Sequence, residues 1–346
     1  MTILPPPTLR LRLDTAALAD NWRALDRLSG AARAGAAVKA DGYGLGAGQV
    51  VPVLAEAGAR DFFVAHWSEV PEVIAHVPPE RVAVLHGPLH DDDCAFARKV
   101  GVRPVLNSLA QVARWQASGG GTCDLMVDTG INRLGVPVRA LGDPVFAGLE
   151  IDTLMSHLAS ADEDSSTNAL QLARFAEVCA QMPARRRSLA NSAGIALGPD
   201  YAFDVTRPGL ALYGGVPRAE LAGEIKAVAH PEAAILQVRE LKAGDGVGYN
   251  HAFIAPRTMR AGVVSLGYAD GFLRSWGEAG ALSHKGRSLP LLGKVSMDMV
   301  VVDLTHAPEI SEGDWLSVPY DLPAAAHTTG LTQYELLTVL GRRFRR

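Results

Sequence analysis

Lys39 is the residue of this sequence whose type and position point most directly to chemistry. It ends an apolar run that includes Ala36, Ala37 and Val38, and a lysine at the end of a buried strand is costly unless it has a task. Burial and neighbouring cations lower the pKa of an amine, which makes the amine nucleophilic towards an aldehyde. The competing interpretation is a lysine whose ammonium group simply reaches water along its apolar stem.

Other polar residues follow further predicted strands in the same way. They are Arg133, His157, Asn191, Ser192 and Arg207. The carboxyl ends of the strands of a parallel barrel meet on one face, where the active sites of such folds lie. We therefore expect these side chains to converge on Lys39. Barrel loops also hold phosphate through backbone N–H groups, and Ser192, Gly209 and Leu210 offer donors of that kind.

Eight short apolar runs alternate with helix-like segments over the first 215 residues. The predicted strands are 34–39, 61–65, 81–86, 103–106, 124–128, 153–157, 186–190 and 204–207. The predicted helices include 15–28, 49–57, 109–117 and 168–180. This spacing suits one βα unit per strand, and eight such units predict an α/β fold of the (β/α)8 barrel type. A doubly wound sheet is the alternative, because periodicity alone does not separate the two.

From about residue 230 the pattern changes to short β-rich segments joined by glycine-rich turns. The predicted strands are 234–241, 259–265, 289–295 and 299–304, with a helical pattern only at 331–340. These features predict a barrel domain over 8–228 and a mostly β C-terminal domain over 229–346, with Pro231 marking the boundary. The basic stretch 342–346 is expected to be a solvated end.

The composition argues against several other classes of protein. The 33 basic and 37 acidic residues give a net charge of −4, which does not suit a protein that coats nucleic acid. The sequence contains no apolar run long enough to span a membrane and no signal-peptide pattern at residues 1–8, so we expect a cytoplasmic protein. Three scattered cysteines do not indicate a disulfide framework.

Two weaker patterns also have to be interpreted. The glycines between 42 and 48 do not form the dinucleotide-binding fingerprint, which disfavours a dehydrogenase. His86, His90 and the aspartates 91–93 are residue types that bind metals. We interpret this cluster as a loop whose aspartates cap a helix, and we expect no metal site.

The segment from Val38 to Gly46, Val-Lys-Ala-Asp-Gly-Tyr-Gly-Leu-Gly, resembles the pyridoxal-phosphate (PLP) lysine signature of the alanine racemase family. Seven further segments match that family in the same order: 127–135, 156–162, 191–194, 207–214, 247–250, 267–271 and 296–298. The family joins a PLP-binding barrel to a β domain. It forms a head-to-tail homodimer in which each β domain completes the partner's active site. The resemblance implies interconversion of L- and D-alanine, which supplies D-alanine for peptidoglycan.

The resemblance also implies which residues hold the cofactor. Lys39 would carry PLP as a Schiff base, and Arg207 would face the pyridine nitrogen. Because a guanidinium is a poor proton donor, that nitrogen would stay largely unprotonated, which should suppress side reactions such as transamination. The remaining cofactor-binding residues would be Tyr43, Asn191, Ser192, Gly209, Leu210 and Tyr334.

Racemisation needs acid/base groups on both faces of Cα, and the resemblance assigns Lys39 to one face and the partner's Tyr249 to the other. A phenol with a pKa near 10 is a poor base at neutral pH, so a neighbouring cation is needed. The candidate is His157, linked in turn to Arg207.

The remaining matched residues would handle the amino acid. Arg133 and the backbone N–H of Met297 would contact its carboxylate, and Arg133 would also contact the phenolic oxygen of PLP. The entrance would be lined by Asp162, Tyr268 and Tyr334. A competing interpretation of Tyr249 and Tyr268 is that they are cross-strand packing residues. Arg274 and Asp298 could in the same way be no more than an ion pair.

One departure from the family pattern bears on Arg133. Many members have a lysine seven positions before this arginine, and that lysine becomes carbamylated and orients the guanidinium. The position is Met126 here, so Asn132, a bound chloride or another hydrogen bond would have to orient Arg133. Because methionine cannot be carbamylated, activity should not depend on bicarbonate. The alternatives that stay open are a racemase of serine, lysine or arginine, a non-catalytic PLP-carrier barrel and, less favoured, a decarboxylase of the ornithine type.

Overall fold

The computed structural model describes residues 5–277, 279–341 and 343–344. The chain forms two compact units, Thr15–Lys226 and a second one in which Ala227–Arg346 is joined by the N-terminal segment up to Asp14. The expected boundary differs at the start of the chain, because β1 (Leu9–Leu13) pairs antiparallel with β12 (Ala229–Leu241). Pro231 lies inside β12 opposite Leu11 and therefore does not mark the boundary.

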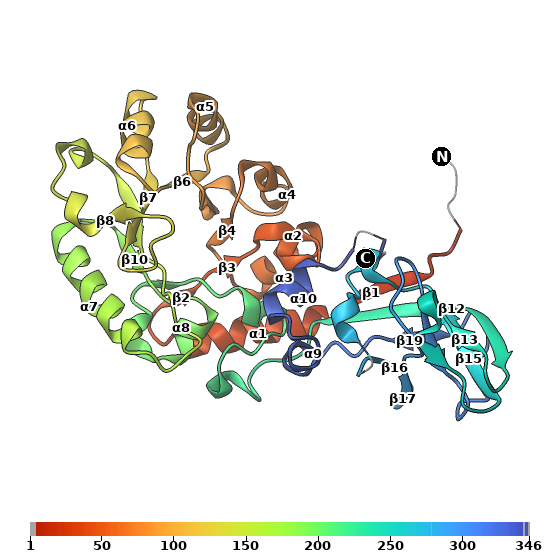
Figure 1. Cartoon of the computed structure of the whole chain (residues 1–346). Coiled ribbons are helices and arrows are strands. Elements are labelled where there is room, and N and C mark those ends of the chain that lie inside the picture. The colour runs from red at the N-terminus through yellow and green to blue at the C-terminus, as the bar shows by residue number, and fades with distance from the viewer. Residues whose placement is uncertain (1–4, 278, 342, 345–346) are drawn as a thin grey trace. The chain divides into compact units, whose positions relative to one another are not determined.

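The first unit is built on a curved sheet of parallel strands (Figure 1). Seven strands lie in the order β3 (Ala36–Ala37), β4 (Phe62–Val64), β5 (Val82–Val84), β6 (Arg103–Leu106), β7 (Cys123–Asp128), β9 (Ile151–Met155) and β10 (Arg186–Ser188). The short strand β8 (Val136–Pro137) pairs with β7, and β11 (Val205–Thr206) pairs with β2 (Arg33–Ala34). All of these pairs are parallel.

Backbone hydrogen bonds around β11 close this sheet. The N–H of Arg207 donates to Ala190 at 2.8 Å on one side, and the N–H of Ala37 donates to Pro208 at 2.9 Å on the other. The last strand region thus contacts both the seventh and the first, as in a barrel. The predicted α/β barrel is confirmed, and the doubly wound alternative is wrong.

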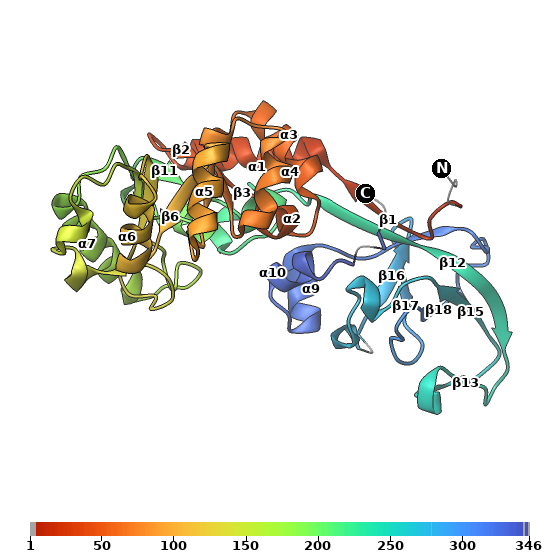
Figure 2. The same ribbon diagram turned by 90° about the horizontal axis from the view of Figure 1, so that it is seen from above.

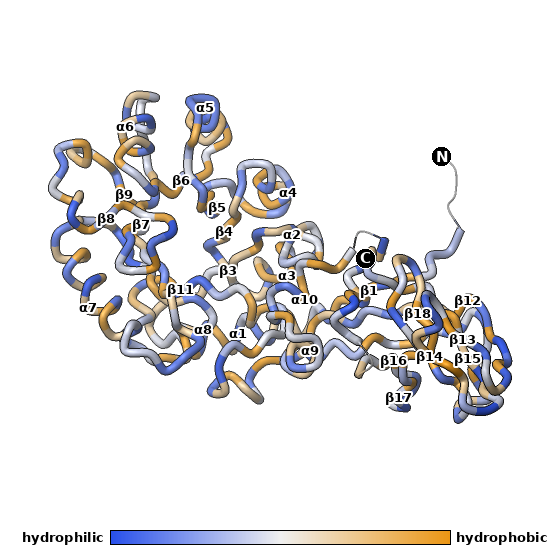
Figure 3. Tube along the Cα trace, viewed as in Figure 1, coloured by the Kyte–Doolittle hydropathy of each residue, from blue (hydrophilic) through white to orange (hydrophobic). Residues whose placement is uncertain are grey.

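Helices cover the outside of the barrel (Figure 1). They are α1 (Thr15–Leu28), α3 (Ala47–Ala57), α4 (Val70–Ile74), α5 (Asp91–Val100), α6 (Leu109–Ala117), α7 (Ser166–Gln181) and α8 (Ser192–Ala196). Strands β4, β5 and β6 are buried along their whole length, because one face meets the helices and the other fills the barrel. The hydropathy colours of Figure 3 follow this arrangement, with a largely hydrophilic α5 outside the apolar strands.

The aspartates of the predicted capping loop do cap a helix. Asp93 lies in the first turn of α5, and its Oδ2 accepts the N–H groups of Leu89 at 2.8 Å and His90 at 2.9 Å. The ring of His86 instead packs edge-on against His66, with centroids 4.2 Å apart.

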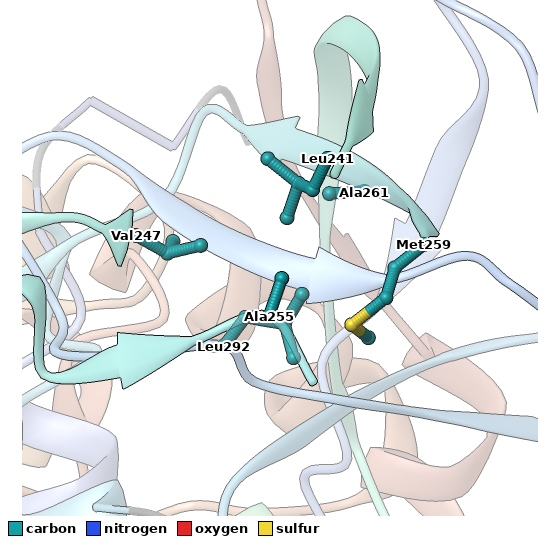
Figure 4. Close-up of a cluster of buried hydrophobic side chains, with 6 residues drawn as sticks. All are labelled: Leu241, Val247, Ala255, Met259, Ala261 and Leu292. Carbon is teal, nitrogen blue, oxygen red and sulfur yellow. The ribbon is translucent and has the colours of Figure 1, made fainter. Parts of the chain in front are cut away.

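The second unit contains an antiparallel sheet in the order β17 (Arg287–Pro290), β16 (Ala281–His284), β19 (Trp315–Ser317), β12, β15 (Met259–Val264) and β18 (Val300–Asp303), with β1 beside β12. Figure 2 shows the long β12 that carries both β1 and this sheet. A hairpin of β13 (Gly246–Val247) and β14 (Phe253–Ile254) and the helices α9 (Leu322–Thr329) and α10 (Gln333–Thr338) complete the unit. Its apolar side chains include the cluster of Leu241, Val247, Ala255, Met259, Ala261 and Leu292 (Figure 4).

The C-terminal stretch is not simply a solvated end. Arg343 donates from Nε to Oδ1 of Asp270 at 2.7 Å and from Nη1 to Oδ1 of Asp298 at 2.6 Å, and Phe344 is buried. Asp298 is therefore paired with Arg343 and not with Arg274, whose guanidinium lies 5.3 Å from the ring centre of Tyr268. Residues 342 and 345–346 of the predicted tail lie outside the described residues. In the part of the chain that the structure describes, no helix is long and apolar enough to cross a membrane.

Candidate active site

Lys39 lies directly after β3 and begins a turn of unusual backbone conformation, α2 (Lys39–Tyr43). The φ angles of Ala40, Asp41, Gly42 and Tyr43 are 54°, 55°, 63° and 56°. We call these four residues the left-handed turn. A non-glycine residue pays about 1–2 kcal/mol for this conformation, and such strain persists only where surrounding contacts impose it.

Several hydrogen bonds impose the left-handed turn. The N–H groups of Gly42 and Gly44 donate to Val38 and Ala40 at 2.9 and 2.8 Å. The turn is also tied to α3, because Oδ1 of Asp41 accepts the N–H of Ala47 at 2.7 Å. As a result the side chains of Lys39 and Tyr43 have a fixed spacing at the two ends of one rigid turn.

Tyr43, Ser192 and Gly209 come together beside this turn. The ring of Tyr43 stacks on Tyr213 with centroids 4.7 Å apart. A side chain at Gly209 would collide with the hydroxyl of Tyr43, so the missing Cβ makes room for that hydroxyl. The Oγ of Ser192 accepts the N–H groups of Gly209 at 2.9 Å and Ala211 at 3.2 Å, which leaves its own O–H as a donor. The result is a cradle of hydroxyl donors held by the backbone of the loop after β11, and O–H groups of this kind bind a phosphate.

The two other predicted cradle residues lie in the adjoining segments. Leu210 begins a short 3-10 helix, Leu210–Tyr213, and its side chain is buried. Asn191 caps α8, because its Oδ1 accepts the N–H of Gly194 at 2.8 Å. Asn191 also forms a parallel bridge with Arg207, which joins the loops after β10 and β11.

Arg207 is buried and its guanidinium makes a defined set of contacts. Nη1 donates to Oγ of Ser188 at 2.5 Å, and Nη2 donates to the carbonyl of Ser156 at 2.6 Å. The same Nη2 lies 3.4 Å from Nδ1 of His157. Burial lowers the pKa of Arg207 to about 10, which leaves the guanidinium charged at neutral pH. Ser188 was not predicted, and its place on a buried strand gives no sequence signal for this role.

His157 is neutral, which corrects the expectation that it supplies a positive charge. Burial and the nearby charges of Arg207, Arg133 and Lys39 lower its pKa to about 3. At neutral pH the imidazole can therefore assist a neighbouring oxygen only through a hydrogen bond. The positive charge in this part of the site belongs to Arg207.

Lys39 carries an amine that is easier to deprotonate than a solvated lysine. Burial lowers the pKa of Lys39, the charges of Arg133 and Arg207 lower it further, and the carboxylate of Glu69 opposes them. The same environment affects His86, whose pKa is lowered by burial, by His66 and by Lys39. Lys39 thus has the properties of a nucleophile towards an aldehyde.

Arg133 is exposed on the loop after β7 and makes no hydrogen bond or ion pair with any residue that the structure describes. Asn132 does not orient it, because the Asn132 amide donates to Gly130 at 3.4 Å, within its own loop. Met126 is buried in β7. Asp128 shapes the loop, since its Oδ1 accepts the N–H groups of Gly130 and Asn132 at 2.9 and 3.2 Å.

The other predicted site residues belong to other segments of the chain. Asp162 is exposed in the loop between β9 and α7. Tyr249, Tyr268, Met297 and Tyr334 belong to the second unit. Tyr249 is 68% exposed in the β13–β14 hairpin, which speaks against a cross-strand packing role. Tyr268 and Met297 lie on loops joined by backbone hydrogen bonds, from Tyr268 to Ser296 and from Ala269 to Met297, both 3.0 Å.

Glu69 is a second residue that the sequence analysis missed. It ends the 3-10 helix Trp67–Glu69 after β4. Its carboxylate accepts the N–H of Ala40, in the turn after β3, and the N–H of Ala65, directly after β4. A glutamate three residues after the start of a helical segment is a capping signal that could have drawn attention to it.

Comparison with known proteins gives a consistent result over the whole chain. The family described as alanine racemase, N-terminal domain, matches residues 13–217, and that described as alanine racemase, C-terminal domain, matches 228–346. An alanine racemase of Acidiphilium cryptum is 41% identical over 350 residues, which cover 97% of each chain. A biosynthetic alanine racemase of Agrobacterium fabrum is also 41% identical, over 98% of this chain and 93% of that protein.

Solved structures agree with the sequence relatives. The alanine racemase of Bartonella henselae with covalently bound pyridoxal phosphate has a TM-score of 0.91 and 36% identity, and covers 99% of both chains. The biosynthetic enzyme of Pseudomonas aeruginosa has a TM-score of 0.87 and 32% identity, again over 99% of both. Together with the lysine turn and the cradle beside it, these similarities show that the chain belongs to the alanine racemase family.

Proposed function

We propose that this protein interconverts L- and D-alanine with PLP bound at Lys39. The observation that carries the proposal is the meeting of Lys39, Arg207 and the cradle of Tyr43, Ser192 and Gly209 at the carboxyl ends of the barrel strands. The near full-length similarity to the Acidiphilium cryptum alanine racemase supports the choice of substrate.

The residues present suit PLP in two respects. The hydroxyls of Tyr43 and Ser192 both lie beside Gly209, whose missing Cβ makes room for the Tyr43 hydroxyl, and such O–H donors match a phosphate. The lowered pKa of Lys39 suits a bond to an aldehyde carbon. We assign Asn191, Leu210 and Tyr334 to the same cofactor. When bound, PLP supplies an electron-withdrawing ring that acidifies the Cα–H of the attached amino acid.

Arg207 sets the electronic character of the site. Its guanidinium is fixed by Ser188 and Ser156 and stays protonated at neutral pH. A group that keeps its protons in this way does not transfer one to a ring nitrogen, and this favours proton exchange at Cα over transamination.

Two side chains move the protons in this proposal. Lys39, whose amine becomes free when the substrate amine replaces it on the cofactor, removes or returns a proton on one face of Cα, and the partner's Tyr249 does so on the other face. The exposure of Tyr249 in its own chain supports a role towards a second copy. Neutral His157 assists the phenol by a hydrogen bond. Arg133 and Met297 hold the substrate carboxylate, and Asp162, Tyr268 and Tyr334 limit the entrance.

The wider setting of the reaction also belongs to this proposal. The enzyme acts as a homodimer in the cytoplasm, and its D-alanine is used for peptidoglycan. The name of the biosynthetic relative in Agrobacterium fabrum supports this role. Analytical ultracentrifugation of the purified protein tests the dimer directly, and a monomer at micromolar concentration would contradict it.

The first experiment is incubation of the purified protein with PLP and L-alanine, followed by chiral separation. We expect the mixture to approach equal amounts of the two enantiomers. If no D-alanine forms while PLP remains bound at Lys39, alanine is the wrong substrate, and serine, lysine and arginine are tested next.

The acid/base assignment has a separate test. Y249F should lower the racemisation rate by about 10²-fold or more, the usual effect of removing a positioned acid/base group. Y268F removes a hydroxyl from the proposed entrance and should retain most of the rate. Full activity in Y249F would refute the two-base assignment even with PLP bound.

A further inference from the structure

Glu69 connects two loops on the face of the barrel that carries Lys39. Its Oε1 accepts the N–H of Ala40 at 2.5 Å, in the residue directly after Lys39. Its Oε2 accepts the N–H groups of Ala65 at 2.7 Å and His66 at 3.0 Å, at the end of the neighbouring strand β4. One carboxylate thus ties the start of the left-handed turn to the adjacent strand.

The left-handed turn needs such a tie more than an ordinary loop does. Ala40, Asp41 and Tyr43 each adopt a positive φ, which is unfavourable for a residue with a Cβ. The second residue of the turn, Asp41, is anchored to α3. Glu69 anchors the residue before it, Ala40, to the neighbouring strand, and a hydrogen bond to a charged acceptor is stronger than one between neutral groups.

The charge of Glu69 also acts on the amine of Lys39. The cations facing this amine are Arg133 and Arg207, and the imidazoles of His86 and His157 lie within electrostatic range. Glu69 is the acidic group that opposes these cations at Lys39. It therefore has a geometric and an electrostatic effect on the same side chain.

We propose that Glu69 is a positioning residue that holds the left-handed turn and thereby fixes both the Lys39 amine and the Tyr43 hydroxyl towards the cofactor. The inference rests on the proposed function only in taking Lys39 as the lysine that binds PLP. It requires neither alanine as the substrate nor Tyr249 as a base.

Two variants separate the geometric effect from the electrostatic one. E69A removes the charge and all three hydrogen bonds. E69Q removes the charge but keeps one acceptor oxygen, so its amide can satisfy only one of the two sides. The matched control is E72Q, because Glu72 is an exposed glutamate on the next turn and has no hydrogen bond to the left-handed turn among the described residues.

The first measurement is amide hydrogen exchange of the full-length protein with PLP bound, read by mass spectrometry on peptides that contain Ala40 and Ala65. We expect exchange at these amides to become about tenfold faster in E69A and to change less in E69Q. E72Q should match the wild type. Unchanged exchange in both Glu69 variants would overturn the proposal.

The second measurement is the pH dependence of Lys39 acylation in the full-length protein stripped of PLP. E69Q removes a negative charge that raises the pKa of the Lys39 amine, so this pKa should fall, whereas a merely structural residue would leave it unchanged. Both measurements are independent of turnover. A wild-type protein that fails to form D-alanine would refute the proposed function and leave these results intact, and an unchanged Lys39 titration in E69Q would refute the electrostatic effect of Glu69.

Discussion

Nη2 of Arg207 lies 3.4 Å from Nδ1 of His157, and this contact fixes the protonation state of the imidazole. A guanidinium can only donate hydrogen bonds, so Nδ1 accepts and the single imidazole proton is placed on Nε2. The low pKa of His157 has the same consequence, because burial beside Arg207 disfavours a second positive charge. His157 is therefore a neutral donor through Nε2, held in place by a fixed cation behind it.

The state of His157 should make the protein sensitive to acid. Its pKa falls from 6.5 to about 3 on folding, so between these pH values the unfolded chain binds a proton that the native chain does not. The contribution of His157 to the free energy of unfolding is therefore fully present above pH 6.5 and is lost as the pH falls. Between pH 7 and pH 5 the loss should be about 2 kcal/mol.

Urea unfolding at pH 7 and pH 5, followed by tryptophan fluorescence, measures this loss. H157Q should be less stable than the wild type at pH 7 but should lose less between the two pH values. H76Q, at an exposed position, is the control and should keep the wild-type dependence. A wild-type dependence in H157Q would contradict the assignment.

A methyl group at Gly209 should disturb the cofactor cradle. In G209A the new Cβ collides with the hydroxyl of Tyr43 and comes within 3.4 Å of Cβ of Ala37. Either Tyr43 moves or the loop after β11 does, and we expect PLP affinity to fall by about tenfold or more, which corresponds to the loss of one to two hydrogen bonds. Titration of the cofactor-free protein with PLP measures the affinity. In the control G142A, the added Cβ has no atom within 4 Å, so wild-type affinity is expected. Equal PLP affinities of G209A and G142A would contradict this role of Gly209.

Arg343 should support the loops that carry Tyr268 and Met297. It forms a two-point ion pair with Asp270, whose side chain is 1% exposed, and a further one with Asp298. R343A leaves the Asp270 carboxylate buried without its cation. We expect stability to fall by about 2 kcal/mol, less than for a fully buried pair because Arg343 is half exposed.

The same change should raise KM for alanine severalfold, because Asp298 directly follows Met297. The control is R287A, since Arg287 forms an exposed pair with Glu309 at 3.0 Å and should contribute less than about 1 kcal/mol. Urea unfolding and initial racemisation rates test both variants. An R343A protein with the stability and KM of R287A would count against this role.

Bicarbonate should have no effect on the wild-type rate. Met126 is buried in β7 and its thioether cannot form a carbamate. M126K restores an amine at that position, and its buried charge is costly unless the amine is carbamylated and faces Arg133. We therefore expect M126K, but not the wild type, to gain activity when bicarbonate is added to degassed buffer. A clear rise in the wild type would show that a carbamate forms elsewhere.

The sequence pattern predicted most of the barrel and the residues that converge on it. Each of the eight expected strands overlaps an observed strand, and helices α1 and α6 have the expected bounds. These elements were predictable because the periodicity of apolar residues reflects which faces an element buries. A strand that is buried on both faces shows this within its own segment, as a continuous apolar run. Lys39, Ser192, Gly209 and Arg207 were predictable because each comes within a few residues after a strand and the strand ends of a barrel share one face.

The N-terminal segment and the C-terminal residues were assigned wrongly for a common reason. Strand β1 is separated from its partner β12 by more than 200 residues, and Arg343 from Asp270 by 73. Local propensity contains no information about such a partner, so the sequence alone predicts that Leu9–Leu13 belongs to the barrel that follows it and that Arg343 is solvated.

What the sequence by itself determined is the kind of protein: a barrel followed by a β domain, with a lysine, an arginine and a phosphate cradle at the strand ends. Only the tertiary structure decided how these groups are tuned. The neutrality of His157, the support of Arg207 by Ser188 and the anchoring of the lysine turn by Glu69 all depend on burial and distance between residues far apart along the chain. Electrostatic effects follow from that spacing in three dimensions, which no pattern of residue types along one segment contains.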